Sequence, residues 1–243
     1  DETGEISCSS SSIVPKAISE LKKVFEDKLF VIADVCNCEY TTHGHCGTII
    51  DNDVDNDLTL KTLSSQSLVL AKSGADALAP SDMMDGRVKA IRDILDNNKF
   101  EKIPIFPYSV KYNSAFYGPF REAAKSSPNF GDRKTYQMNF KNSEEAINEV
   151  KLDINEGADV IIIKPAISYL DIIYRIKQKF NVPIIAYNVS GEYTMVKSAS
   201  EKNFINGIET ILEILHSIKR SGANAIISYH ALEVAKYLKA NDL

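Results

Sequence analysis

The sequence predicts an α/β fold built as a (β/α)8 barrel, and three observations support this prediction. Short apolar runs alternate with amphipathic segments along most of the chain, the pattern of βα units around a parallel sheet. A Gly-Ala-Asp or Gly-Ala-Asn signature joins a predicted helix to a predicted strand at residues 73–76, 156–159 and 221–224. Chemically useful side chains end nearly every predicted strand, namely Asp34, Ser81, Ser109, Lys164, Ser190 and Tyr229. A barrel whose active site lies at the C-terminal face has this distribution.

A doubly wound sheet is the alternative for such a series of βα units. No Gly-x-Gly-x-x-Gly follows any predicted strand, which disfavours the dinucleotide-binding version of that fold. After a flexible Ser-rich segment at 7–12, Pro15 opens an amphipathic helix that runs to Lys28. The later elements are strands at 30–35, 75–80, 103–108, 158–164, 183–189 and 223–229, and helices at 58–73, 85–97, 115–126, 143–156, 168–180, 206–221 and 231–240.

Six strands are fewer than a closed barrel needs. We therefore expect residues 1–243 to form one catalytic barrel domain with about six of the eight βα units. The first two barrel strands, and any N-terminal arm, would precede Asp1. The chain begins without Met, so a targeting sequence upstream is left open. The expected compartment is the cytoplasm, with a plastid-type organelle as the alternative.

Composition narrows the classes of partner. The 243 residues are 44% hydrophobic and 25% charged, which is ordinary for a globular protein. A net charge of -5 argues against a nucleic-acid partner. No apolar run approaches the roughly 18–20 residues of a membrane span, so no membrane partner is expected. Four cysteines are too few for a disulfide framework in a chain of this length.

Lys164 stands at the end of a run of β-branched residues that reads as a strand buried on both faces. Gly157 closes the preceding helix in the left-handed conformation, and Pro165 ends the strand. An ammonium group in such a place has a lowered pKa, because burial disfavours the charged form. The neutral amine is the form that attacks carbonyl carbons. The alternative is an ordinary strand-end lysine that reaches solvent.

Three cysteines and two histidines lie close together in residues 36–46. Cys36 and Cys38, two residues apart on an extended chain, point to the same side, and the loop through Gly44 returns Cys46 to them. Three thiolates with one open position fit a zinc ion that binds water or substrate. His43 and His45 would supply a fourth ligand or support the others. The alternative is a group of small buried hydrophobic residues.

Lys111 follows the third predicted strand, so two lysines from neighbouring units are expected to converge on one pocket. Their mutual repulsion would lower at least one pKa. The segment 115–139 carries Arg121, Arg133 and Lys134, as in mobile loops that close over anionic substrates. An ordinary charged surface loop is the alternative. Hydroxyl groups at two further strand ends would hold a carboxylate, namely those of Tyr187, Ser190, Tyr193, Ser228 and Tyr229.

Together these features predict a Schiff-base enzyme for a carboxylated keto substrate with a thiolate-bound metal nearby. Over essentially all 243 residues the sequence resembles the porphobilinogen synthase (5-aminolevulinate dehydratase) family. The matching motifs are Asp-Val-Cys-x-Cys-x-Tyr-Thr-x-His-Gly-His-Cys-Gly at 34–47, Ala-Pro-Ser-Asp-Met-Met-Asp-Gly-Arg at 79–87, Ser-Ala-Phe-Tyr-Gly-Pro-Phe-Arg at 114–121, Gly-Asp-Arg-Lys-x-Tyr-Gln-Met at 131–138, Ile-Lys-Pro with Tyr-Leu-Asp in 163–171, and Val-Ser-Gly-Glu-Tyr at 189–193.

The resemblance implies condensation of two 5-aminolevulinate molecules into porphobilinogen with loss of two waters, in tetrapyrrole (haem) biosynthesis. It implies that Lys164 forms a Schiff base with the substrate that becomes the propionate side, and Lys111 with the second substrate. By resemblance, the second substrate's carboxylate is bound by Arg121, Arg133 and Gln137, and the first substrate's by Ser190 and Tyr229. The site would also be lined by Asp34, Ser81, Asp82, Tyr117, Phe120 and Tyr187.

The same resemblance implies the cofactors and the assembly. Cys36, Cys38 and Cys46 match the zinc ligands of the zinc-dependent branch, whereas other branches place Asp there and use magnesium or no metal at the active site. Glu149 corresponds to a position that binds an allosteric magnesium in some members. Members assemble through an N-terminal arm, so a homo-octamer is expected for the full-length protein.

Two other functions remain open on the sequence. A class I aldolase on the same barrel explains one lysine and the arginines, but leaves the three-cysteine cluster without a role. A non-catalytic, regulatory zinc-binding subunit explains the cysteines, but the presence of both Lys111 and Lys164 speaks against it.

Overall fold

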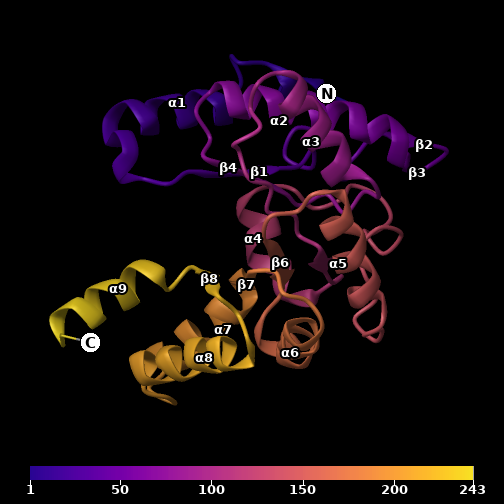
Figure 1. Cartoon of the computed structure of the whole chain (residues 1–243). Helices are drawn as coiled ribbons and strands as arrows, with labels where there is room; N and C mark the ends of the chain where they lie inside the picture. Colours follow the sequence, from indigo (N-terminus) through magenta and orange to yellow (C-terminus); the bar gives the residue numbers. More distant parts are fainter. Residues whose placement is uncertain (243) are drawn as a thin grey trace.

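The structure, a computed structural model, describes residues 1–242 as a curved parallel sheet with helices on its outer side (Figure 1). The strands are β1 Ile32–Val35, β2 Ile49–Ile50, β3 Asp53–Val54, β4 Ala77–Pro80, β5 Val110–Lys111, β6 Ile161–Lys164, β7 Ile184–Asn188 and β8 Ala225–Ser228. The α-helices are α1 Ile13–Phe25, α2 Asn56–Lys72, α3 Arg87–Asn97, α4 Gly118–Ala123, α5 Glu145–Glu156, α6 Leu170–Lys179, α7 Ser190–Glu201, α8 Gly207–Ser221 and α9 Ala231–Ala240. Four short 3-10 helices complete the chain, namely η1 Glu5–Cys8, η2 Glu26–Lys28, η3 Ala115–Tyr117 and η4 Ile167–Tyr169.

The main strands run parallel in chain order, β1 beside β4 and then β5, β6, β7 and β8. The extended segment before β5 joins these two groups, because Phe106 N–H donates to Leu78 O at 2.7 Å and Ile162 N–H donates to Pro107 O at 2.8 Å. Five main strands and the extended segment 103–108, which leads into β5, therefore form one arc of a barrel. In order around the arc these are β1, β4, the segment with β5, β6, β7 and β8. Within residues 1–242 the arc does not close, and β1 and β8 are its two edges.

The predicted strand at 103–108 is wrong as a regular strand. The segment lies where the prediction placed it, but only Ile105 forms a ladder bridge, to Leu78. Pro104 and Pro107 have no backbone N–H, so the segment lacks the donors that a regular ladder needs. The paired strand begins two residues later, as β5.

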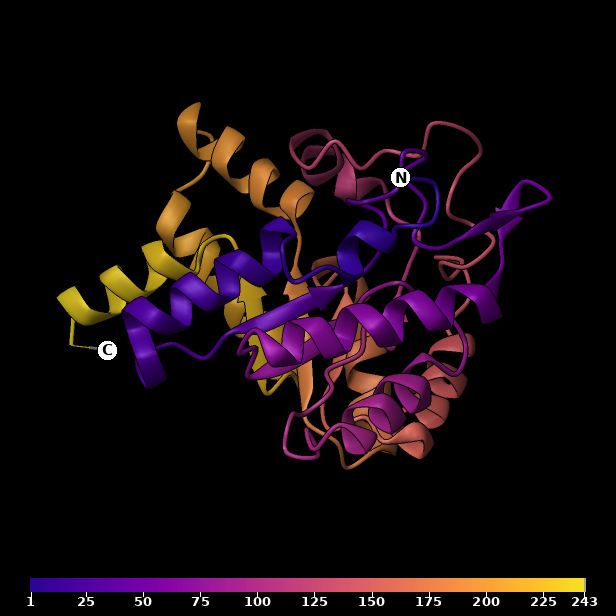
Figure 2. The ribbon, with the colours of Figure 1, turned by 90° about the horizontal axis from the view of Figure 1, so that it is seen from above.

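Helices α1, α2, α3, α5, α6 and α8 follow one another around the outside of the arc, each packed on the next (Figures 1 and 2). Alternate residues of the strands face opposite sides. On the outer side, Ile161 and Ile163 of β6 pack with Ile173 and Ile176 of α6. On the inner side, Ile162 packs with three other buried residues, Ala79, Tyr108 and Ile185. Because β6 packs against helices on one side and against the barrel interior on the other, its residues are apolar on both faces.

Other differences from the predicted elements are local. The helix expected to Lys28 ends at Phe25, and the helix expected at 115–126 is divided into η3 and α4 around Gly118 and Pro119. Helix α7 and the β2–β3 hairpin were not predicted. The sequence of α7 contains three Ser and one Gly and has no continuous apolar stripe, so periodicity gives little signal for it.

Helix α7 packs closely against η3 and α4 at the C-terminal end of the strands. This approach requires Gly191, since a Cβ there would lie 2.6 Å from Phe116 O and 2.8 Å from Phe116 Cα. Gly157 ends α5 with φ of 109°, as the sequence predicted. Within residues 1–242, no helix combines the length and the apolar character needed to cross a bilayer.

Gly191→Ala is expected to lower the free energy of unfolding by about 1–3 kcal/mol, because the added methyl group meets backbone that cannot move away without disturbing η3. Gly118→Ala is the matched control, since a Cβ at Gly118 has no atom within 4 Å. Urea unfolding measures both. Equal unfolding midpoints for the two variants would show that α7 and η3 are not held in this close contact.

Candidate active site

Two lysines lie side by side at the C-terminal end of the sheet. Lys111 is the register partner of Lys164 in the parallel β5–β6 pair. The Nζ atom of Lys164 is surrounded by four aromatic rings, at 4.6 to 5.6 Å from their centroids, namely those of Tyr187, Tyr117, Tyr108 and Phe120. Tyr108 lies between the two amines, 5.7 Å from Nζ of Lys111.

Burial lowers the pKa of Lys164 to about 7, as the sequence predicted. The positive charge of Lys111 lowers it further, while the carboxylate of Asp34 opposes the shift. The four rings present their negative faces to the amine and favour its charged form, but this attraction is smaller than the loss of hydration. Lys164 is thus an amine that gains and loses its proton near neutral pH.

Lys111 is held by the loop that follows β4. Its side chain is 4% exposed, and Nζ donates a hydrogen bond to the backbone carbonyl of Ser81. The hydroxyl group of Ser81 donates to Asp34 Oδ1 at 2.7 Å. Burial raises the pKa of Asp34, whereas Ser81, Lys111 and Lys164 stabilise its ionised form. The ends of β1, β4, β5 and β6 therefore meet in one polar cluster.

The three cysteines of the loop after β1 are buried together. Their Sγ atoms all lie within 4.8 Å of one another, and those of Cys36 and Cys38 are 3.4 Å apart. Hydrogen bonds from the Cys36 and Cys38 thiols lower the pKa of Cys46 well below its usual range, and Arg133 lowers it further. Sharing of the negative charge raises the pKa of Cys38 to about 12.

This donor set fits a zinc ion. Sulfur atoms bound to a tetrahedral zinc at about 2.3 Å are about 3.8 Å apart. The three Sγ atoms have a comparable spacing, 3.4 Å between Cys36 and Cys38 and no more than 4.8 Å for any pair. The lowered pKa of Cys46 favours its thiolate form, and a cation would replace the protons of the other two thiols. In the part of the chain that the structure describes, no other group of three His, Cys, Asp or Glu side chains is this close.

A cavity of about 120 Å³ connects the lysines with the cysteines and the cationic loop. Its walls include Asp34, Cys36, Cys38, Ser81, Lys111, Lys164, Tyr117, Phe120, Tyr187, Arg121 and Arg133. Arg133 is fixed by Nη2 donating to Gly44 O at 2.8 Å and Ser126 O at 2.6 Å. Burial and the neighbouring Arg133 lower the pKa of Arg121, which lies over the Tyr117 ring. Within residues 1–242, the Nε atoms of both guanidinium groups are buried without a hydrogen-bond acceptor.

Ser190 and Tyr229 lie in a second, smaller pocket on the other wall of the same aromatic group. The two pockets share Lys164, Tyr117, Phe120 and Tyr187. Ser190 Oγ accepts a hydrogen bond from Phe120 N–H at 3.1 Å, and the Tyr229 hydroxyl lies 3.3 Å from that of Tyr187. Lys164 thus stands between a pocket with hydroxyl groups and a pocket with guanidinium groups.

Four predicted site residues line neither pocket, and one of them, Cys46, is buried within the cysteine cluster. Gln137 is 3% exposed and lines a neighbouring cavity of about 320 Å³, with neither amide atom hydrogen-bonded. Asp82, in the loop after β4, is fully buried. Glu149 lines a separate cavity of about 410 Å³, where burial raises its pKa to about 7 against the attraction of Arg87. The structure therefore separates Glu149 from the lysine site.

The sequence analysis missed other residues of the main cavity. Val14, Glu39, Tyr40 and Gln66 also line it. Gln66 is 2% exposed, donates to Cys36 O at 3.2 Å, and has no partner for its carbonyl oxygen. Its signal was present, because Gln66 lies between Leu63 and Leu70 on the buried face of α2, where a polar side chain is out of place.

Known proteins resemble the chain over nearly its full length. A model of the family described as delta-aminolevulinic acid dehydratase matches residues 1–237. The protein of that name from Bacillus subtilis is 52% identical over 98% of this chain and 73% of the relative. Its namesake from Archaeoglobus fulgidus is 50% identical over 98% of this chain and 74% of the relative.

A solved structure adds the fold. It is the crystal structure of delta-aminolevulinic acid dehydratase (porphobilinogen synthase) from Toxoplasma gondii ME49 in complex with the reaction product porphobilinogen. Its TM-score is 0.95 at 45% identity, over 97% of this chain and 68% of that chain. The predicted (β/α)8-barrel class, with about six of the eight units in this chain, is confirmed.

Because Lys111 repels and Asp34 attracts the ammonium form of Lys164, Lys111→Met is expected to raise the pKa of Lys164 and Asp34→Asn to lower it. The rate of amine modification rises with pH up to the pKa, since only the neutral amine reacts. The curve for Lys164 should therefore move to higher pH in Lys111→Met and to lower pH in Asp34→Asn. Reductive methylation followed by peptide mass mapping measures these curves, and coincident curves would contradict the coupling.

Proposed function

The chain belongs to the delta-aminolevulinic acid dehydratase family, and on that premise we propose that it condenses two 5-aminolevulinate molecules into porphobilinogen with loss of two waters. The reaction is that of a hydro-lyase in tetrapyrrole biosynthesis. The observation that carries the proposal is the register pairing of Lys111 with Lys164 at one cavity, with the pKa of Lys164 lowered to about 7. Two lysines allow two keto acids to be activated together.

Lys164 acts first on the substrate that becomes the propionate side. Its neutral amine attacks the keto carbon, a carbon–nitrogen bond forms, and the keto oxygen leaves as water. The resulting iminium is a flat cation, and the four rings around Nζ place their negative faces toward it. The same rings exclude water, which would return the iminium to the ketone.

Lys111 forms the corresponding iminium with the second substrate, and its keto oxygen leaves as the second water. Each iminium withdraws electrons from the neighbouring carbon, so that one substrate can lose a proton and attack the other. The carbon–carbon and carbon–nitrogen bonds of the new ring then displace the two lysine amines. The substrates give up two waters in all, and both amines return to their initial state.

The two pockets bind the two carboxylates by different chemistry. Arg121 and Arg133 provide charged donors for the second substrate's carboxylate, and Gln137 joins them if the loop moves it from its neighbouring cavity. Ser190 and Tyr229 provide neutral donors for the first substrate's carboxylate. This difference orients the two copies of one substrate in opposite roles.

Zinc is the metal we propose for Cys36, Cys38 and Cys46, on the buried three-thiol donor set. When bound, it supplies Lewis acidity beside the second substrate's amino group. Magnesium at Glu149 is a separate, regulatory proposal, supported only by the acidic cavity around that residue. A homo-octameric assembly and a cytoplasmic location, with a plastid-type organelle as alternative, remain predictions for the full-length protein.

Borohydride added with 5-aminolevulinate is expected to trap both iminium ions and to add substrate mass to the peptides that contain Lys164 and Lys111. Porphobilinogen released without borohydride, detected by its colour with an aldehyde reagent, separates the proposal from a class I aldolase. Labelling of neither lysine would refute the Schiff-base assignment. Zinc bound in full with no turnover would instead favour the regulatory subunit.

Removal of metal by a chelator is expected to abolish porphobilinogen formation, with recovery when zinc is added back. Cys46→Ser should bind zinc at least about tenfold more weakly, because one of three thiolate ligands is lost. Cys8→Ser is the matched control, since Cys8 lies outside the cluster. Zinc affinity is measured by competition with a chromogenic chelator, and full activity of metal-free protein would contradict the role of the site.

A further inference from the structure

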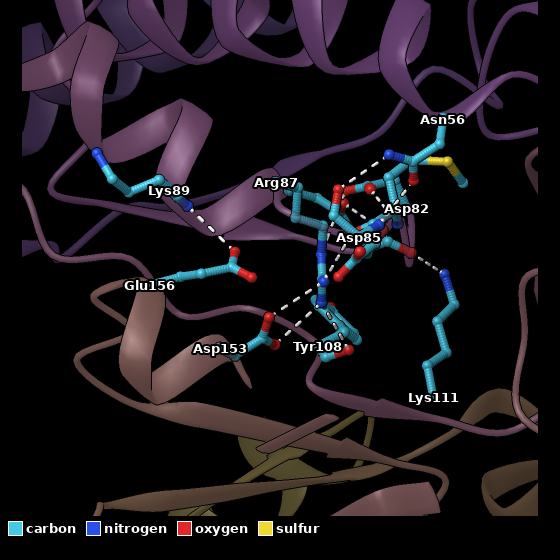
Figure 3. Close-up of polar contacts among 12 residues, drawn as sticks. Asn56, Asp82, Asp85, Arg87, Lys89, Tyr108, Lys111, Asp153 and Glu156 are labelled. Carbon is cyan, nitrogen blue, oxygen red and sulfur yellow. Dashed lines mark hydrogen bonds and ion pairs between the residues drawn. The ribbon is translucent and has the colours of Figure 1, made fainter. Parts of the chain in front are cut away.

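Arg87 lies outside the pocket, yet its buried side chain joins three parts of the fold. It is 2% exposed. Nη1 donates to Met84 O at 2.9 Å and Nη2 donates to Tyr108 O at 3.3 Å. Both nitrogens also bind the carboxylate of Asp153 on α5, each at 3.2 Å (Figure 3). The guanidinium group therefore ties the loop after β4, the segment before β5 and α5 together.

Asp82 connects these contacts of Arg87 to the active site. Its Oδ1 accepts a hydrogen bond from Met84 N–H at 2.7 Å, and its Oδ2 lies 3.8 Å from Arg87 Nε. Burial raises the pKa of Asp82 to about 6 despite the nearby guanidinium charge, so the carboxyl group is ionised at neutral pH. Met83, between these residues, has φ of 73°, a conformation that a non-glycine residue holds only where its surroundings fix it.

The carbonyl group that accepts the hydrogen bond from Lys111 belongs to the peptide bond between Ser81 and Asp82. A peptide bond is planar, so the position of Asp82 sets the direction of that carbonyl. Figure 3 shows the sequence of contacts from Asp153 through Arg87 and the β4 loop toward Lys111. Arg87 also binds the backbone of Tyr108, whose ring lies near both amines, whereas the hydrogen bond from the β4 loop reaches Lys111.

We propose that Arg87 is a positioning residue for Lys111: through Met84 and Asp82 it fixes the Ser81 carbonyl that aims the Lys111 amine at the second substrate. This inference rests on the proposed function, in which Lys111 carries that substrate. A buried ion pair contributes little net stability compared with apolar residues of similar volume. The contacts of Arg87 with two backbone carbonyls instead give it a geometric role.

The test compares the labelling of Lys111 with the labelling of Lys164 in the same protein sample, so that Lys164 serves as the internal reference. Borohydride trapping with 5-aminolevulinate is followed by peptide mapping, and the ratio of labelling at Lys111 to labelling at Lys164 is measured. In Arg87→Lys, which keeps the charge but not the forked geometry, the ratio is expected to fall about tenfold, since small displacements of a reacting group have effects of this size or larger. Restoration of arginine should restore the ratio.

A second variant guards against loss of the fold. Arg87→Met with Asp153→Leu removes both charges of this pair together. Asp82, which loses the guanidinium beside it, can become neutral because its pKa is already raised to about 6. The circular dichroism of the double variant should match the unchanged protein while the labelling ratio falls as in Arg87→Lys. Arg175→Lys is the matched control, because Arg175 makes an ion pair with Glu144 at the surface and should leave the ratio unchanged.

Each outcome decides the inference. A ratio in both Arg87 variants equal to that of the unchanged protein would overturn it, as would an equal loss of label at Lys111 and Lys164. Unfolding of both variants would also overturn it, since Arg87 would then act on the whole fold. Failure of the unchanged protein to label either lysine refutes the proposed function instead, so the two failures are distinguishable.

Discussion

The site depends on the cost of removing one amine from water at the end of β6. Lys164 loses hydration because its strand is buried on both faces and its Nζ lies among four aromatic rings. The rings attract a cation, but less strongly than water does. The amine is therefore neutral for part of the time at pH 7, and the cation formed from it as an iminium meets a surface suited to a flat, weakly hydrated charge.

The parallel register carries this constraint to the neighbouring strands. It places Lys111 directly beside Lys164, so the charge of Lys111 disfavours the protonated form of Lys164. The repulsion between the two lysines is offset by nearby groups of negative charge, namely the carboxylate of Asp34 and the thiolate of Cys46. The thiolate in turn stabilises the buried cation of Arg133. Substrate, metal and lysine sites are consequently parts of one charge balance, in which a change at one group alters the proton affinity of the others.

The sequence reveals those parts of the fold that rest on local patterns. The buried strand ending at Lys164, the Gly157 helix end and the three-cysteine loop all follow from residue types and spacing. The segment at 103–108 does not, because its prolines prevent the ladder that its apolar residues suggest. Helix α7 was not predicted because its buried residues are mostly small or polar, with Val196 as the one apolar residue among them. Gln66 could have been found as a polar residue on the apolar face of α2. Arg87 could not, because its importance comes from contacts distant in sequence.

The central claim is that Lys164 is a desolvated amine with a pKa near 7, and it is tested most directly by nuclear magnetic resonance. The protein is labelled with ¹³C at lysine Cε, and the Lys164 signal is assigned by its absence in Lys164→Met. Its chemical shift is then followed from about pH 5 to pH 11, a range that spans the shifted pKa and the ordinary lysine pKa of about 10.4. We expect a midpoint of about 7. A midpoint near the ordinary lysine value would contradict it, because the amine would then be charged in almost every molecule at neutral pH.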